Sequence, residues 1–265
     1  MVTQSLTPEL IRALAALLCI TVGYAAYYFI AFSDRAGRFF KKHHAPVQNE
    51  ISLFLFQKLT GFFFLGLLPG VIYLQLFPFY PERYSFAGIQ PPVPVYVVVL
   101  LALLIVITAA FSAKKHDIYR RIPHMRIHHW GIKEIAISIG GWAMYLLAYE
   151  FIFRGLLLFS TAEAWGLWPA VLINLFFYAV FHIPNGRKET LAAIPFGLVL
   201  CAVSLLSGSF WLAFLLHLVL SVSTEMFAIH FNPDMQFHFR GALEAERARE
   251  RGGEGENERG GESKK

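Results

Sequence analysis

Long runs of mainly apolar residues with few or no charges recur along the chain, and they limit its fold more than any other feature. A transmembrane α-helix needs roughly 20 predominantly apolar residues to cross the hydrocarbon core of a bilayer. Runs of comparable length lie at Leu14–Phe32, Leu59–Phe79, Val95–Ser112, Ile135–Leu158, Pro169–His182, Thr190–Ser207 and Phe210–Ile229. The sequence therefore predicts an all-α fold, a polytopic transmembrane helical bundle of about seven spans, within a range of roughly six to eight.

The composition agrees with lipid as the main solvent. Of 265 residues, 56% are hydrophobic and 16% aromatic, so a soluble domain would have to hide an implausible amount of apolar surface. Charged residues make up only 15% and cluster between the apolar runs, which marks those stretches as loops. The net charge of +5 follows from Lys and Arg in these loops, so we expect a lipid bilayer, and not nucleic acid, as a partner.

The basic loops also predict a topology. Ser33–Lys58 and Ala113–Glu134 are rich in Lys and Arg, whereas Tyr80–Pro94 between them holds a single Arg, so the first two are expected in the cytoplasm. Continuing the alternation places the C-terminus inside and the N-terminus outside. Leu14–Phe32 is not followed by an A-x-A cleavage site, so we expect it to be retained as a helix and not removed as a signal peptide. We expect an integral protein of a bacterial or archaeal plasma membrane.

Three regions follow from these patterns. Residues 1–134 are expected to form N-terminal transmembrane helices with basic cytoplasmic loops, residues 135–230 a helical core with buried polar residues, and residues 231–265 a charged cytoplasmic tail. From about Ala242 the tail consists of Glu, Arg and Gly repeats that cannot bury enough apolar surface to order themselves. The histidines of the basic loops are interpreted as solvated or headgroup-facing, and Cys19 and Cys201 as small buried hydrophobes.

Ionisable residues inside the apolar runs are the candidates for function. Such a residue costs on the order of 3 kcal/mol at bilayer depth, so it usually faces the bundle interior and has a task. Glu150 and Arg154 are spaced four apart, on one helical face and close enough to pair. His182 closes one apolar run and His217 lies within another. For each alone, a structural role as an interhelical polar clamp or a satisfied core hydrogen bond competes with a functional one.

Taken together, these residues point to hydrolysis. Ser221 and Glu225 follow His217 at one and two further helical turns, so the last helix carries a polar seam. Two neutral imidazoles and a carboxylate that converge on one water can polarise it for attack on a peptide carbonyl, while other donors stabilise the oxyanion. The same set, His182 and His217 with Glu150, could instead hold a divalent metal ion such as zinc. No other cofactor is expected.

The order of these motifs resembles the CPBP family, which covers CAAX prenyl proteases and bacteriocin-processing or immunity (Abi-type) enzymes. The resemblance rests on Tyr149-Glu150-Phe151-Ile152-Phe153-Arg154-Gly155, Phe181-His182-Ile183-Pro184 and Gly208-Ser209-Phe210-Trp211 leading to His217. The family pattern is E-E-x-x-x-R, then F-x-x-x-H, then H-x-x-x-N or a similar polar residue. It implies a catalytic-type core over 135–230, with Glu150, Arg154, His182, His217 and Ser221 as catalytic residues.

The chain departs from this pattern at Tyr149, which stands where the family has its first Glu, and at Tyr178 and Ser221 in the other two motifs. A phenol with a pKa near 10 is a poor general base at neutral pH. The missing carboxylate could come from Glu150 or from Glu225, and the sequence leaves both open. Tyr149 and Glu225 are therefore additional site candidates.

Three functions remain in view. The first is an intramembrane endopeptidase of CPBP or CAAX-protease type, of the metallo- or glutamate class, which cuts a membrane-associated and, in one version, lipidated protein with water activated by Glu and His. The second is a catalytically inactive relative that acts as a membrane binding, immunity or chaperone-like factor. The third is a transporter, because intramembrane Glu, Arg and His also line transport paths.

Overall fold

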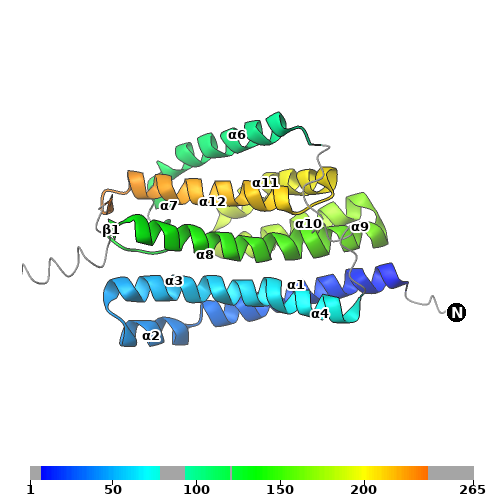
Figure 1. The fold of residues 1–265 in the computed structure, drawn as a ribbon, viewed down its shortest axis with the longest axis horizontal. Coiled ribbons are helices and arrows are strands. Elements are labelled where there is room, and N and C mark those ends of the chain that lie inside the picture. Colours follow the sequence, from blue (N-terminus) through cyan, green and yellow to red (C-terminus); the bar gives the residue numbers. More distant parts are fainter. Residues whose placement is uncertain (1–6, 78–92, 120, 238–265) are drawn as a thin grey trace, which may run out of the picture.

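The computed structural model describes residues 7–77, 93–119 and 121–237, and within these ranges the chain is almost entirely helical (Figure 1). Seven of the described helices are long and apolar enough to span a membrane, so the prediction of an all-α polytopic bundle is confirmed. The tail from Ala242 and most of the loop Tyr80–Pro94 lie outside the described residues. The expectations for those two segments stay predictions.

The N-terminal part forms two long helices joined by a short amphipathic one. Helix α1 (Pro8–Ala31) begins at a Thr7 cap that accepts a hydrogen bond from the Leu10 amide, and α2 (Asp34–His43) is exposed with basic residues in its last turn. Helix α3 (Pro46–Phe62) continues through the π-helical segment η1 (Phe63–Leu67) into α4 (Leu68–Leu76). This second span begins at Pro46, inside the stretch predicted as a loop, because the run after it is apolar enough to stay helical.

Apolar residues of the second basic stretch pack against the bundle, whereas its residues His116, His124 and His128 are exposed, in line with their interpretation as solvated. After α6 (Val95–Ala113) and the single turn α7 (His116–Tyr119), strand β1 (His129–Trp130) pairs in parallel with β2 (Gln236–Phe237). Apolar side chains alternate with the basic ones in this stretch and form a small core with the start of α3, made of Ile51, Phe54, Met125, Ile127 and Trp130. The stretch therefore closes one end of the bundle.

The C-terminal half supplies the remaining spans. Helix α8 (Ile132–Glu150), the π-helical segment η2 (Phe151–Leu158) and α9 (Phe159–Trp165) form one continuous helix. It is followed by α10 (Leu167–His182), the 3-10 turn η3 (Ile183–Asn185), α11 (Arg187–Ser207) and α12 (Trp211–Phe231). Gly166 (φ 86°) and Gly208 (φ 62°) make the tight turns before α10 and after α11, in a backbone region that favours glycine.

Helix α8 lies at the centre of the arrangement (Figure 1). Helix α3 packs against one side of it and α12 against another, while α6 covers α12 from outside. The approach of η1 to α8 is close, because a Cβ atom added at Gly66 would lie 2.6 Å from the Cβ of Ala148. Polar residues of α8 are therefore held in the middle of the bundle, away from lipid.

Candidate active site

Glu150 and Arg154 meet at the junction of α8 and η2. Arg154 Nη1 lies 3.0 Å from Glu150 Oε2, and neither side chain is exposed. Breaking such a buried pair from one side leaves an uncompensated charge, so each residue fixes the other. The guanidinium also stacks 4.4 Å from the ring centre of Tyr178 and donates to the carbonyl oxygen of Gly197. Arg154 thus holds the Glu150 carboxylate in one position.

The other oxygen of Glu150 reaches His217 on α12. The distance from Glu150 Oε1 to His217 Nδ1 is 2.6 Å. Because a carboxylate accepts hydrogen bonds, Nδ1 must carry the proton when the His217 ring is neutral. The ring's Nε2 is then an acceptor. This is the arrangement in which a carboxylate orients a histidine for general base chemistry.

His182 has the same tautomer for a different reason. Its Nδ1 lies 2.7 Å from the carbonyl oxygen of Tyr178, one helical turn earlier on α10, so in a neutral ring Nδ1 donates and Nε2 is left as an acceptor. The Tyr178 ring lies against both histidines, with centroid distances of 4.5 Å to His182 and 6.2 Å to His217. The two imidazoles therefore flank the same aromatic side chain.

The π-helical segment η2 shapes this wall of the site. In a π-helix the backbone bonds run from i to i+5, and such segments are frequent at functional sites. Asn174 on α10 is fully buried, and its Nδ2 donates to the carbonyl oxygen of Phe153 at 2.7 Å. This hydrogen bond joins the π-helical segment η2 to α10. It thereby links the segment that carries Arg154 to the helix that carries His182.

Tyr149 precedes Glu150 in the chain, and its ring lies against the rings of Tyr178 and His217. Its ring stacks on Phe153 with centroids 4.6 Å apart and meets His217 edge-on at 5.8 Å. The side chain is buried, and its hydroxyl has no hydrogen-bond partner among the described residues. A buried polar atom without a partner calls for an explanation. Here it is a donor that no described residue uses.

These side chains line a cavity of about 710 Å³, the polar cavity, bounded by parts of α1, α3, α7, α8, α10, α11 and α12. The volume lies within the range of roughly 300–1,000 Å³ common for small-molecule sites. Its walls include Tyr149, Tyr178, His182, His217, Ser221 and Glu225. Glu150 and Arg154 stand behind this wall, fully buried, and act on the cavity through His217 and Tyr178.

Glu225 lies in the polar cavity but in a different cluster. Ser138 Oγ donates to its Oε2 at 2.8 Å, and Trp142 Nε1 donates to the same oxygen. The Lys58 ammonium lies 3.1 Å from the centre of the Trp142 ring and 3.5 Å from His124 Nδ1. The carboxylate in contact with His217 is thus Glu150. Glu225 belongs to the second cluster, two helical turns away.

Sequence reasoning missed Lys58 and His124 in this second cluster. Both were assigned to basic loops, yet Lys58 is buried within α3, and the exposed ring of His124 lines the cavity beside it. The Nδ1 atom of His124 lies 3.5 Å from the Lys58 ammonium, so in a neutral ring Nδ1 is the acceptor and Nε2 carries the proton. A lysine directly before the apolar run that starts at Leu59 was the available signal, because such a side chain can point back into the bundle.

The donors do not form an evident metal site. Among the described residues, no group of three or more His, Cys, Asp or Glu is placed to hold a metal ion. Glu150, the carboxylate expected to join the two histidines as a ligand, is occupied on one oxygen by Arg154 and on the other by His217. The chemistry below is therefore derived from the side chains alone.

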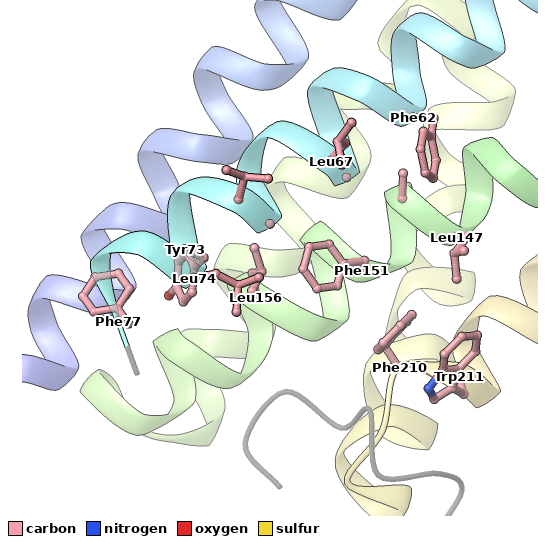
Figure 2. Close-up of a pocket in the computed structure, with 14 residues that line it drawn as sticks. Phe62, Leu67, Tyr73, Leu74, Phe77, Leu147, Phe151, Leu156, Phe210 and Trp211 are labelled. Atoms are coloured by element: carbon pink, nitrogen blue, oxygen red, sulfur yellow. The ribbon is translucent and has the colours of Figure 1, made fainter. Parts of the chain in front are cut away.

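A second cavity of about 370 Å³ lies on the opposite side of α8 and η2, between α4, η1 and the start of α12 (Figure 2). Its lining is almost wholly apolar and includes Leu67, Leu74, Phe151 and Phe210. The hydroxyl of Tyr73 is engaged with Ser160 and the Arg12 carbonyl. This apolar cavity shares no lining residue with the polar cavity. It offers no group that could activate water.

Fold and site together define a polytopic helical membrane protein with a Glu–Arg–His cluster beside the polar cavity. Residues 131–223, about a third of the chain, match the family model for type II CAAX prenyl endopeptidases, Rce1-like. The resemblance to the CPBP family expected from the motifs is thus confirmed over these residues. No curated protein and no solved structure matches the chain.

Proposed function

We propose that the protein is an intramembrane endopeptidase that hydrolyses a peptide bond near the C-terminus of a prenylated, membrane-associated protein. The substrate class follows the printed name of the matching family. The observation that carries the reaction type is the contact of 2.6 Å between Glu150 Oε1 and His217 Nδ1, on the wall of a cavity that His182 also lines. A histidine oriented in this way by a buried carboxylate is suited to take a proton from water.

His217 is the general base in this proposal. Its Nε2 takes a proton from a water molecule, the water oxygen bonds to the peptide carbonyl carbon, and the π bond electrons move to the carbonyl oxygen. Glu150 stabilises the imidazolium that results, and Arg154 keeps that carboxylate in place. The imidazolium then returns the proton to the leaving amine as the C–N bond breaks. His182 supports the step as a second acceptor that orients the water.

Tyr149 has a defined role in this scheme, although it cannot act as a base. A phenol with an ordinary pKa near 10 is protonated at neutral pH and donates hydrogen bonds. The unpartnered hydroxyl of Tyr149, beside His217, is suited to stabilise the oxyanion that forms on the peptide carbonyl. The work that the family assigns to its first Glu falls in this chain to the pair Glu150 and His217.

A second candidate function rests on the same residue. With Tyr149 in place of the first Glu, the chain could bind a lipidated peptide in the polar cavity without cutting it, as a membrane immunity or chaperone-like factor. The ordered Glu150–His217 contact favours the peptidase, because a binding protein has no need of an oriented base. The two functions make opposite predictions for the variant Tyr149→Glu.

The deciding experiment is cleavage of S-farnesylated and unmodified peptides by the purified protein in bilayer nanodiscs. Glu150→Ala, His182→Ala and His217→Ala are expected to lower the cleavage rate by about 10²- to 10⁴-fold, the usual contribution of a general base and its partners. His43→Ala on the exposed helix α2 is the matched control and should cleave like wild type. If wild type is inactive and Tyr149→Glu is active, the peptidase proposal fails and the binding function stands.

A further inference from the structure

A second polar cluster shares the cavity with the Glu150–His217 pair, and the mechanism does not use it. This Lys58 cluster consists of Lys58, His124, Ser138, Trp142 and Glu225, contributed by α3, the stretch before β1, α8 and α12. Lys58 and Glu225 are 4% and 1% exposed. Charges buried at this depth in a membrane bundle are costly and mark functional sites. All but Ser138 and Trp142 lie outside the segment that matches the family model.

The cluster keeps unused hydrogen-bonding capacity beside the cavity, which Lys58 and Glu225 both line. Glu225 accepts two bonds on Oε2, while its Oε1 has no partner in the described part of the chain. Lys58 contacts the Trp142 ring and His124, and no carboxylate of a described residue lies within 4.0 Å of its Nζ. Lys58 and Glu225 nonetheless both contact Trp142, the first at the ring face and the second at Nε1. One cation with free donors and one carboxylate oxygen are thus presented side by side.

The distance from this cluster to the reacting centre follows from the packing of α8 on α12. Among the contacts that link the helices are Glu150 with His217 and Trp142 with Glu225. The members of the two contacts are eight residues apart on both helices, so the helices run antiparallel in one register. Eight residues of α-helix rise by about 12 Å. An extended peptide covers about 3.3–3.6 Å per residue, so three to four residues span the same distance.

We propose that the Lys58 cluster binds the C-terminal residue of the substrate and thereby sets the position of cleavage. The Lys58 ammonium pairs with the terminal carboxylate, and Glu225 Oε1 accepts the amide N–H of the same residue. The peptide between this residue and His217 is extended and three to four residues long. The part of this inference that concerns the cleavage position rests on the proposed peptidase function. Binding of the terminal carboxylate at the Lys58 cluster does not depend on it.

The remaining members of the cluster fit this role. The neutral ring of His124 accepts from Lys58, and Trp142 offers the ammonium its ring face while it donates to Glu225. A cation over an aromatic face is stabilised without being neutralised, which leaves its charge for a ligand. Ser138 and Trp142 hold Glu225 Oε2, so Oε1 is fixed in direction. The site is therefore formed before the peptide arrives.

The test compares two S-farnesylated peptides that are identical except for the C-terminus, one a free acid and the other an amide. Binding is measured by fluorescence anisotropy of an N-terminal dye, and cleavage by mass spectrometry, with wild-type protein in nanodiscs. We expect the acid to bind about 10- to 100-fold more tightly, the range for a hydrogen bond to a charged group. Lys58→Met should abolish this preference and Lys58→Arg should keep most of it. Lys41→Met on exposed α2 is the matched control.

Each outcome decides the question. Equal binding of acid and amide by wild type overturns the proposal, as does a Lys58→Met variant that weakens both peptides equally, or no binding of either peptide. Acid preference without cleavage upholds the site and rejects the peptidase. Cleavage without a preference for the acid upholds the peptidase and rejects the carboxylate site. A peptide lengthened by one residue at its C-terminus should be cut one residue further along, at a constant distance from the carboxylate.

Discussion

Glu150→Gln tests whether the buried ion pair and the catalytic contact are one unit. The change is nearly isosteric but removes the charge that faces Arg154 Nη1 at 3.0 Å. At an effective dielectric constant of about 20, that separation corresponds to about 5 kcal/mol, and breaking a buried pair from one side costs about 3–5 kcal/mol. The remaining partners of Arg154, the ring faces of Phe153 and Tyr178 and the Gly197 carbonyl, are uncharged. We therefore expect a loss of about 3–5 kcal/mol in unfolding free energy.

The second arm adds Arg154→Met to Glu150→Gln. Removing both charges relieves the uncompensated cation, so stability should return to within about 1–2 kcal/mol of wild type, while cleavage stays absent because His217 has lost its orienting carboxylate. Unfolding is followed by circular dichroism in mixed micelles, and cleavage is measured on the same samples. Two results would refute the reasoning: a Glu150→Gln protein as stable as wild type, or a double variant no more stable than the single one.

Three further predictions follow from single contacts. Tyr149→Phe keeps the ring packing but removes the unpartnered hydroxyl, so kcat should fall about 10²- to 10³-fold with little change in KM; an unchanged kcat would exclude the oxyanion role. Gly66→Val forces η1 away from Ala148 and should cost about 1–3 kcal/mol of stability, measured by unfolding in micelles. Asn174→Leu leaves the Phe153 carbonyl without its 2.7 Å donor and should cost about 1–3 kcal/mol; equal stability would show that water replaces it.

The fold was predictable because membrane spans are read directly from hydropathy. Each of the seven expected runs overlaps one of the seven long apolar helices, and the ends differ by a few residues or, at Pro46, by more than ten. Lys58 illustrates the limit. A positive charge beside an apolar run indicates a loop by the positive-inside rule, but a lysine can also be held inside the bundle by aromatic faces, here those of Trp142 and Tyr145. Whether Lys58 lies in a loop or inside the bundle depends on the packing of α3 against α8, which the residues around Lys58 alone do not reveal.

The site was predictable in part. The spacing of Glu150 and Arg154 on one helical face predicted a pair, and the structure brings them to 3.0 Å. The sequence left open whether Glu150 or Glu225 would stand beside the histidines, because His217 and Glu225 share a face of α12. The register between α8 and α12 makes that choice, since it sets Glu150 opposite His217 and Trp142 opposite Glu225. The π-helical geometry of η2 had no sequence signal that we recognised.

The shared register of α8 and α12 makes the two helices one mechanical element. A slip of α12 by a single turn, about 5.4 Å, would break the Glu150–His217 and Trp142–Glu225 contacts together, so neither end can rearrange while the other stays in place. A ligand that strengthens one contact therefore raises the population in which the other is formed, and by linkage the effect is reciprocal. Binding of a ligand at Lys58 then raises the fraction of molecules in which His217 is held by Glu150, although the two places are separated by about 12 Å of helix.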